Sequence, residues 1–170
     1  MVMFDQYVLG VSESEQELEG IEAVGGAALA LAGQAGQTLE IFTRDLDPRL
    51  YDTPEFADAC ARLACNGRRA RIRILLMDEN PVVRHGHRLV ELSRRLSSFI
   101  HIRLVHEDYR HCTHAYLVAD GRGYCYREQG DRYQAVINFN DVLRARELVD
   151  EFNEVWEHSQ PSAELRRLHL

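Results

Sequence analysis

Lysine is missing from this sequence, and all 20 of its basic residues are arginine. A Walker A phosphate loop, a Schiff-base enzyme and a lysine general base each need a lysine amine, so the composition excludes all three. Long hydrophobic runs are missing too. The longest apolar stretch, residues 23–32, covers about ten residues, whereas a membrane-spanning helix needs about twenty. We therefore expect no membrane partner.

Cysteine is scarce as well, with four copies and no CxxC pair. No secretory leader is expected, because acidic residues stand near the start, where a basic and then apolar segment would be. These features favour a cytoplasmic, reduced protein whose thiols are buried. A disulfide between Cys112 and Cys125, on neighbouring predicted strands, is kept as an alternative.

The net charge of −7 argues against a free nucleic-acid binder. Five of the acidic residues crowd into residues 13–22, however, so the rest of the chain is close to neutral and has room for a local basic patch. With 170 residues and a hydrophobic fraction of 45%, the chain is predicted to form one globular domain.

Helices and strands alternate through the first two thirds of the chain. A capping box at Ser12 and Glu15 predicts the start of the first helix. Thr53 and Asn80, each followed by proline, predict the starts of two more helices, the second reaching about residue 97. Apolar segments with alternating character predict strands over residues 38–43, 71–77 and 100–105. Strands joined by helices imply parallel pairing.

The last third predicts antiparallel strands. Asp120-Gly121 lies between the strand segments 113–119 and 124–128, and an Asp-Gly pair in this position is typical of a β-hairpin. Residues 132–138 predict one more short strand, and Asp141 caps the last long helix. The chain is therefore predicted to be α/β, with a mixed sheet flanked by helices and a C-terminal β-hairpin and helix.

This element order, closed by a helix that ends in Phe152-x-x-x-Trp156-Glu157, resembles one half of the phospholipase D fold over about residues 12–158. Three strings resemble, more narrowly, a proteobacterial family of uncharacterised phospholipase D-like domains: Arg44-Asp45-Leu46-Asp47-Pro48-x-Leu50-Tyr51-Asp52, Gly86-His87-Arg88-Leu89-Val90-Glu91-Leu92 and Glu164-Leu165-Arg166-Arg167-Leu168-His169-Leu170. The resemblance implies a single phospholipase D-like domain over residues 1–170, with a short tail at 161–170. Some relatives are joined to acetyltransferase domains, which implies an acetyltransferase-type partner.

The phospholipase D signature, H-x-K-x-x-x-x-D, is degenerate here. In that family the histidine attacks phosphorus and the lysine binds the phosphate. Taking Asp120 as the aspartate places Thr113 and Ala115 at the histidine and lysine positions, and a shift by one residue places His114 and Tyr116 there instead. The shift turns the side chains to the other sheet face, and neither register restores the lysine. This departure from the signature therefore argues against phosphodiesterase activity of the family type.

Polar residues that follow predicted strands are candidates for a ligand site, because ligands of open α/β sheets bind beyond the carboxyl ends of the strands. Structural roles compete with this interpretation, since aspartate also favours hairpins and helix starts, and arginine pairs with nearby carboxylates. A catalytic site would draw on His114, His87 and Asp120. The candidate ligand-binding residues are Arg44, Asp45, Asp78, His87, Asp120 and Arg127.

No metal or other cofactor is predicted. His85 and His87 point about 200° apart on a helix and therefore cannot share one metal ion. His111-x-x-His114 beside Cys112 is not a recognised zinc-ligand spacing, although the residue types suit zinc. Histidines in such a loop are ordinarily solvated.

Arginines gather around the second predicted strand, and arginine binds phosphate through a planar fork. Nucleic-acid binding by this arginine face is therefore one alternative function. The net charge argues against it, and no aromatic residues interleave with the arginines to stack on bases. The cluster consists of Arg68, Arg69, Arg71 and Arg73, with Arg94 and Arg95 nearby in the sequence.

We therefore predict a non-catalytic binding or accessory module that recognises a phosphate-bearing ligand. Because active phospholipase D sites resemble two halves that meet at a two-fold axis, the single half implies a homodimer, with a tyrosine-rich interface near residues 113–128. Two alternatives stay open. One is a hydrolase or transferase whose remodelled site uses His114 or His87, and the other is the nucleic-acid-binding domain with an arginine face.

Overall fold

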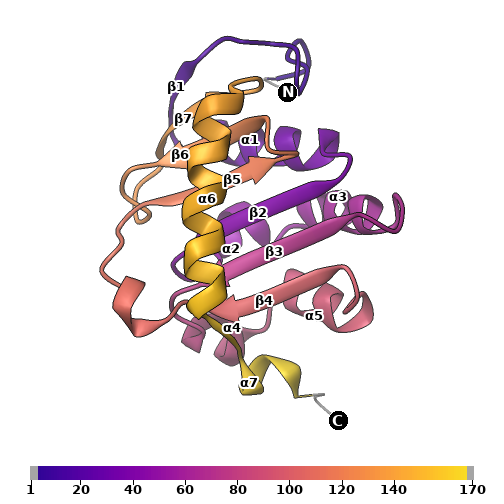
Figure 1. Ribbon diagram of the computed structural model, residues 1–170, viewed down its shortest axis with the longest axis vertical. Coiled ribbons are helices and arrows are strands. Elements are labelled where there is room, and N and C mark those ends of the chain that lie inside the picture. Colours follow the sequence, from indigo (N-terminus) through magenta and orange to yellow (C-terminus); the bar gives the residue numbers. More distant parts are fainter. Residues whose placement is uncertain (1–3, 168–170) are drawn as a thin grey trace.

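The computed structural model describes residues 4–167 and contains a mixed sheet of eight strands in the order β1-β7-β6-β5-β2-β3-β4-β8 (Figure 1). Parallel pairing joins β2 (Thr38–Thr43), β3 (Arg71–Leu76) and β4 (Ile100–Leu104), as their helical connections predict. The predicted α/β mixed sheet is confirmed. The antiparallel strands are β1 (Gln16–Glu19), β5 (Ala115–Ala119), β6 (Gly123–Arg127), β7 (Gln134–Asn138) and β8 (Gln160–Pro161).

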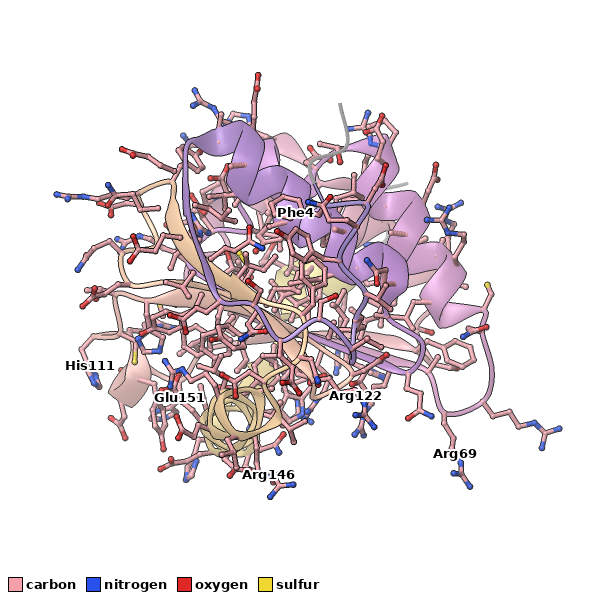
Figure 2. The ribbon with its side chains drawn as sticks, turned by 90° about the horizontal axis from the view of Figure 1, so that it is seen from above. Phe4, Arg69, His111, Arg122, Arg146 and Glu151 are labelled. Atoms are coloured by element: carbon pink, nitrogen blue, oxygen red, sulfur yellow. The ribbon has the colours of Figure 1, made fainter. Side chains whose placement is uncertain are left out.

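Helices cover the two faces of the sheet unequally (Figures 1 and 2). One face packs against α1 (Ile21–Gln34), α2 (Pro48–Tyr51), α3 (Pro54–Ala64) and α5 (Arg88–Arg95), whereas α6 (Val142–His158) crosses the other face. Two short helices, α4 (Asn80–His85) and α7 (Ala163–Arg166), follow β3 and β8. None of the helices in residues 4–167 has the length and apolar character that a bilayer span requires.

Two separate cores result from the alternation of side chains along the strands. On β2, Leu39 and Ile41 are buried against α1, while Phe42 is buried under α6 together with Tyr116. The core under α6 is rich in aromatic rings, and it also borders charged strand residues. This face of the sheet therefore carries most of the polar chemistry described below.

The first helix begins later than the sequence predicted. Ser12 and Glu15 do not cap a helix, and α1 begins at Ile21, after Gly20 with a φ of 98°. The residues between form the edge strand β1, which pairs with β7 and buries Leu18. The local capping preference is overridden because strand pairing satisfies the backbone and removes Leu18 from water.

The helix predicted from Asn80 to about residue 97 is two helices. The break lies at Gly86, whose φ of 75° suits glycine. His87 follows, and its Nδ1 accepts a hydrogen bond from Leu89 N at 3.1 Å, which caps α5. Its Nε2 lies 3.0 Å from Leu46 O, to which it donates. The buried ring thus fixes the break against the loop after β2.

All four cysteines are free thiols. Cys125 lies in the core under α1, where burial raises its pKa to about 12. Cys112 packs against the core under α6 instead. Because the sheet separates the two sulfur atoms, the alternative disulfide between them is not formed.

The hairpin between β5 and β6 is anchored by Asp120. Both turn residues have positive φ, 56° at Asp120 and 62° at Gly121, as the Asp-Gly pair predicted. The Asp120 carboxylate accepts hydrogen bonds from three backbone N–H groups, those of Gly36 at 2.8 Å, Gln37 at 2.8 Å and Thr38 at 3.0 Å. Asp120 therefore ties the hairpin to the start of β2.

We expect Asp120→Ala to lower the free energy of unfolding by about 3 kcal/mol, because three backbone donors lose their acceptor. Asp120→Asn should lower it by only about 1 kcal/mol, since an amide oxygen can keep the bonds to Gln37 and Thr38 and asparagine tolerates positive φ. Urea unfolding measures both changes. The exposed Asp150→Ala is the control, and equal effects of all three substitutions would contradict the anchoring role.

Glu40 is a buried carboxyl group on the α6 side of β2. Its side chain is 3% exposed and lies opposite Arg73 on β3. Burial raises the pKa of Glu40 to about 7, although Arg73 and Arg71 act in the lowering direction. The folded protein therefore disfavours the ionised form of Glu40 at neutral pH.

Because the folded-state pKa of Glu40 lies above the unfolded-state value of 4.5, the protein should lose stability as pH rises from 4.5 to about 7. That difference corresponds to about 3 kcal/mol. We expect Glu40→Gln, which stays neutral, to gain about this much relative to the wild-type chain between these pH values. Urea unfolding at both ends of the range measures it, and parallel pH profiles of the two proteins would refute it.

Candidate functional site

Polar side chains gather where β2 and β3 end and β5 begins. Arg44 and Asp45 follow β2, and Asp78 follows β3. The Asp78 N–H donates to Arg44 O at 2.7 Å, which holds the two loops together. Since β5 runs antiparallel to β2, with Phe42 opposite Tyr116, the start of β5 reaches the same edge. We call this group, with His114, the edge site.

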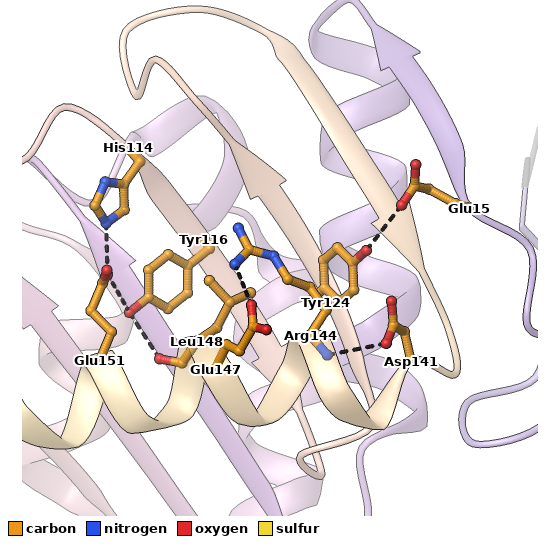
Figure 3. Close-up of polar contacts among 9 residues, drawn as sticks. All are labelled: Glu15, His114, Tyr116, Tyr124, Asp141, Arg144, Glu147, Leu148 and Glu151. Atoms are coloured by element: carbon orange, nitrogen blue, oxygen red, sulfur yellow. Dashed lines mark hydrogen bonds and ion pairs between the residues drawn. The ribbon is translucent and has the colours of Figure 1, made fainter.

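His114 is bound by a carboxylate from α6. Its Nε2 lies 2.6 Å from Oε1 of Glu151, and Tyr116 Oη donates to the same oxygen at 3.1 Å and to Leu148 O at 3.1 Å (Figure 3). Burial alone would raise the pKa of Glu151, but the hydrogen bond and charge of His114, with Tyr116, outweigh it and hold that pKa below its usual value. Glu151 is thus ionised and orients the imidazole.

Stacked aromatic rings also hold the His114 ring in place. Its ring stacks on Phe42 with the centroids 5.4 Å apart, and on Tyr116 and Tyr126 at 5.8 Å each. Tyr116 is fully buried, and burial raises the pKa of its phenol far above the usual value. Tyr116 is therefore a neutral donor at every physiological pH, and it supplies no positive charge to this edge.

The cleft at the edge site is small. Arg44 and His114 both line it, together with Thr113, Cys112 and residues 129–131, and its volume is about 70 Å³. That volume holds a few water molecules, whereas sites for whole small molecules measure roughly 300–1,000 Å³. The cleft can therefore receive one group of a ligand, such as a phosphate, but not a complete substrate.

Arg127 and Asp45 lie near this edge but beside the other core. Arg127 is buried, and its Nη1 donates to Gly130 O at 3.0 Å and to Arg132 O at 3.4 Å. Burial, and then the charge of Asp47, raise the pKa of Asp45. Arg127 therefore has backbone partners of its own, and its fixed position stabilises the loop after β6.

Two of the predicted site residues lie elsewhere. Asp120 is at the opposite end of β5, where it binds the backbone before β2. His87 is buried beneath the loop after β2, both ring nitrogens bind the backbone, and burial lowers its pKa. His114, His87 and Asp120 therefore do not converge. Of the predicted residues, Arg44 and His114 line one cleft, and Asp78 adjoins Arg44 through a backbone hydrogen bond.

The sequence reasoning missed Glu151, the partner of His114. A signal was present, because Glu151 lies three residues after Leu148 and next to Phe152, so a carboxylate falls on the apolar stripe of α6. Within the described residues, no group of three or more His, Cys, Asp or Glu side chains is arranged to hold a metal ion.

Solved structures with a similar fold come from several kinds of protein. NucT from Helicobacter pylori matches with a TM-score of 0.65 and 8% identity, over 88% of this chain and 99% of NucT. Nuc from Salmonella typhimurium, a phospholipase D family member, matches with a TM-score of 0.61 and 13% identity, over 88% of this chain and 97% of Nuc. At these identities the likeness shows the fold alone, and the predicted phospholipase D-like fold is confirmed.

TrmBL2, an archaeal chromatin protein whose structure shows a novel mode of DNA binding, matches with a TM-score of 0.65 and 13% identity. The match covers 88% of this chain and 54% of TrmBL2, so the chain spans about half of that protein. No curated protein sequence matches the chain. The family model of DUF7931, described as a domain of unknown function, matches residues 20–168. The chain therefore belongs to the DUF7931 family.

Proposed function

We propose that this chain is a non-catalytic phospholipase D-like module that binds a phosphate-bearing ligand at the edge site. The observation that carries the proposal is the place of Tyr116. In the register that puts His114 at the histidine position, Tyr116 stands at the lysine position, buried under α6 with its hydroxyl bound to Leu148 and Glu151. Phosphoryl transfer needs a fixed cation on the developing negative charge, and a neutral buried phenol does not supply one.

Phosphate binding is still supported by the side chains at the mouth of the cleft. Arg44 is exposed and lies beside His114, so a guanidinium and an imidazole can reach one phosphate group from two sides. The small volume of the cleft leaves the rest of the ligand outside it. We therefore expect recognition of the phosphate group, with few contacts to the remainder of the ligand.

A homodimer is part of the proposal. Burial within the chain limits the residues that its interface could use. The strand segments 115–119 and 123–125 are buried within the chain, so they are not free to meet a second copy. The exposed ends of these strands, near Thr113 and Glu128, remain. An interface there would bring two edge sites together across a two-fold axis. An acetyltransferase-type partner stays a prediction from the resemblance.

One observation favours an enzyme as the second candidate. Glu151 orients the His114 imidazole at 2.6 Å, which is the arrangement that prepares histidine for nucleophilic or acid–base chemistry. In this alternative the exposed Arg44 would take over the charge role of the missing lysine. His87 does not fit such a site, because both of its ring nitrogens bind the backbone.

One probe, bis(p-nitrophenyl) phosphate, tests binding and catalysis together. We expect NMR signals of the His114 ring to shift on addition of the probe, and Arg44→Gln to weaken binding at least about tenfold through loss of a charge-assisted hydrogen bond. Arg122→Gln removes the same charge from the β5–β6 hairpin, at the far end of these strands, and should leave binding of the probe unchanged. The wild-type chain should release nitrophenol from the probe no faster than the His114→Ala variant does. A rate of nitrophenol release well above that of the variant would establish the enzyme. If the NMR signals of the His114 ring do not shift, the binding site is refuted.

For the dimer, light scattering at micromolar concentration should give twice the mass of one chain. Thr113→Arg, in the exposed segment just before β5, should reduce that mass to one chain by placing like charges opposite each other. A monomer mass for the wild-type chain would contradict the dimer and leave the edge site to act alone.

A further inference from the structure

A second cleft lies at the other edge of the sheet, along β4 and α7. Its volume is about 620 Å³, which falls within the roughly 300–1,000 Å³ that is typical of small-molecule sites. No aspartate or glutamate lines it. Its charged lining consists of Arg71, Arg73, Arg94, Arg103 and Arg166, with His101 beside them, and we call it the arginine cleft.

Aromatic rings of α6 hold two of these arginines in place. The Arg103 guanidinium lies 4.4 Å from the centroid of the Trp156 ring, and its Nη1 donates to Trp156 O at 2.8 Å. The Arg73 guanidinium lies 5.0 Å from the Phe152 ring and 5.5 Å from Trp156. Both cations are thus positioned before any ligand arrives, which lowers the entropic cost of binding.

The Arg73 guanidinium has one N–H donor without a hydrogen-bond acceptor in residues 4–167. Its Nε is buried and has no hydrogen-bond partner within the described residues, and an unsatisfied buried donor is costly. No carboxylate in the described part of the chain lies within 4.0 Å of Arg71, Arg73 or Arg103. Glu40 is opposite Arg73 in the sheet register, but it forms no ion pair with it. Arg71, Arg73 and Arg103 are therefore available to an incoming anion, whereas Arg94 is paired with Glu91 at 2.7 Å.

We propose that the arginine cleft binds a compact ligand with at least two phosphate charges, of the size of a nucleoside diphosphate. Arginine forks match phosphate oxygens, and several forks facing one cavity fit more than one charge. A nucleic-acid strand fits less well. The Trp156 ring is only 8% exposed and already carries the arginines, so it has no free face for a base, and the net charge of −7 repels a polyanion.

This proposal is independent of the edge site. Arg44 and His114 do not line the arginine cleft, and none of its lining residues lines the cleft at the edge site. The acidic segment of residues 13–22 in a second copy is another anion that could meet these arginines. That occupant would make the chain associate through unlike surfaces rather than bind a phosphate ligand.

Titration calorimetry with inorganic pyrophosphate and with adenosine diphosphate tests the proposal on the full chain. We expect both to bind, and Arg73→Met and Arg103→Met each to weaken binding at least about tenfold, the loss of one charged hydrogen bond. Arg71→Gln alters an exposed lining residue and should weaken binding without affecting the fold. Arg146→Met is the matched control, because Arg146 lies on α6 and points away from the sheet (Figure 2).

The outcomes separate the two proposals. Arg44→Gln should leave unchanged the pyrophosphate binding step that Arg73→Met weakens, even where it abolishes binding at the edge site. No heat of binding with pyrophosphate and adenosine diphosphate would overturn the proposal, and so would equal weakening by Arg146→Met. Binding of oligothymidylate in the absence of pyrophosphate binding would assign the cleft to a polymer instead. A larger mass in light scattering that Arg73→Met reduces, without ligand binding, would assign it to the acidic segment of a second copy.

Discussion

Helix α6 crosses a wide face of the sheet, and the polar groups of that face depend on which side chains the helix offers them. At its middle, Glu151 and the carbonyl of Leu148 satisfy His114 and Tyr116. Phe152, next to Glu151, and Trp156, about one turn later, contact the guanidinium groups of β3 and β4. Removing α6 would leave these groups buried without partners or open to water. Its packing therefore organises both clefts.

On the α6 face of this phospholipase D-like fold, aromatic packing surrounds His114. Tyr116 is a neutral phenol, and its ring adds to the aromatic stack that begins at Phe42. Positive charge is instead concentrated in the arginine cleft, where aromatic rings support it.

Much of the fold followed from local patterns. Thr53 and Asp141 cap α3 and α6 through side-chain hydrogen bonds, and the Asp-Gly turn has the expected backbone. These features were predictable because each depends on a few adjacent residues. The predicted start of the first helix was wrong because β1 pairs with β7, more than 110 residues away in the sequence. The break at Gly86 was missed because the apolar spacing continues on both sides of it.

The sequence by itself determined the absence of lysine and the alternation of elements, since both are properties of composition or of neighbouring residues. Only the tertiary structure decided what the candidate residues do. It placed Asp120 at the far end of β5 and His87 beneath a loop, and it brought Glu151 to His114. Burial, sheet register and the path of α6 set these contacts, and all three join residues that are distant in the chain.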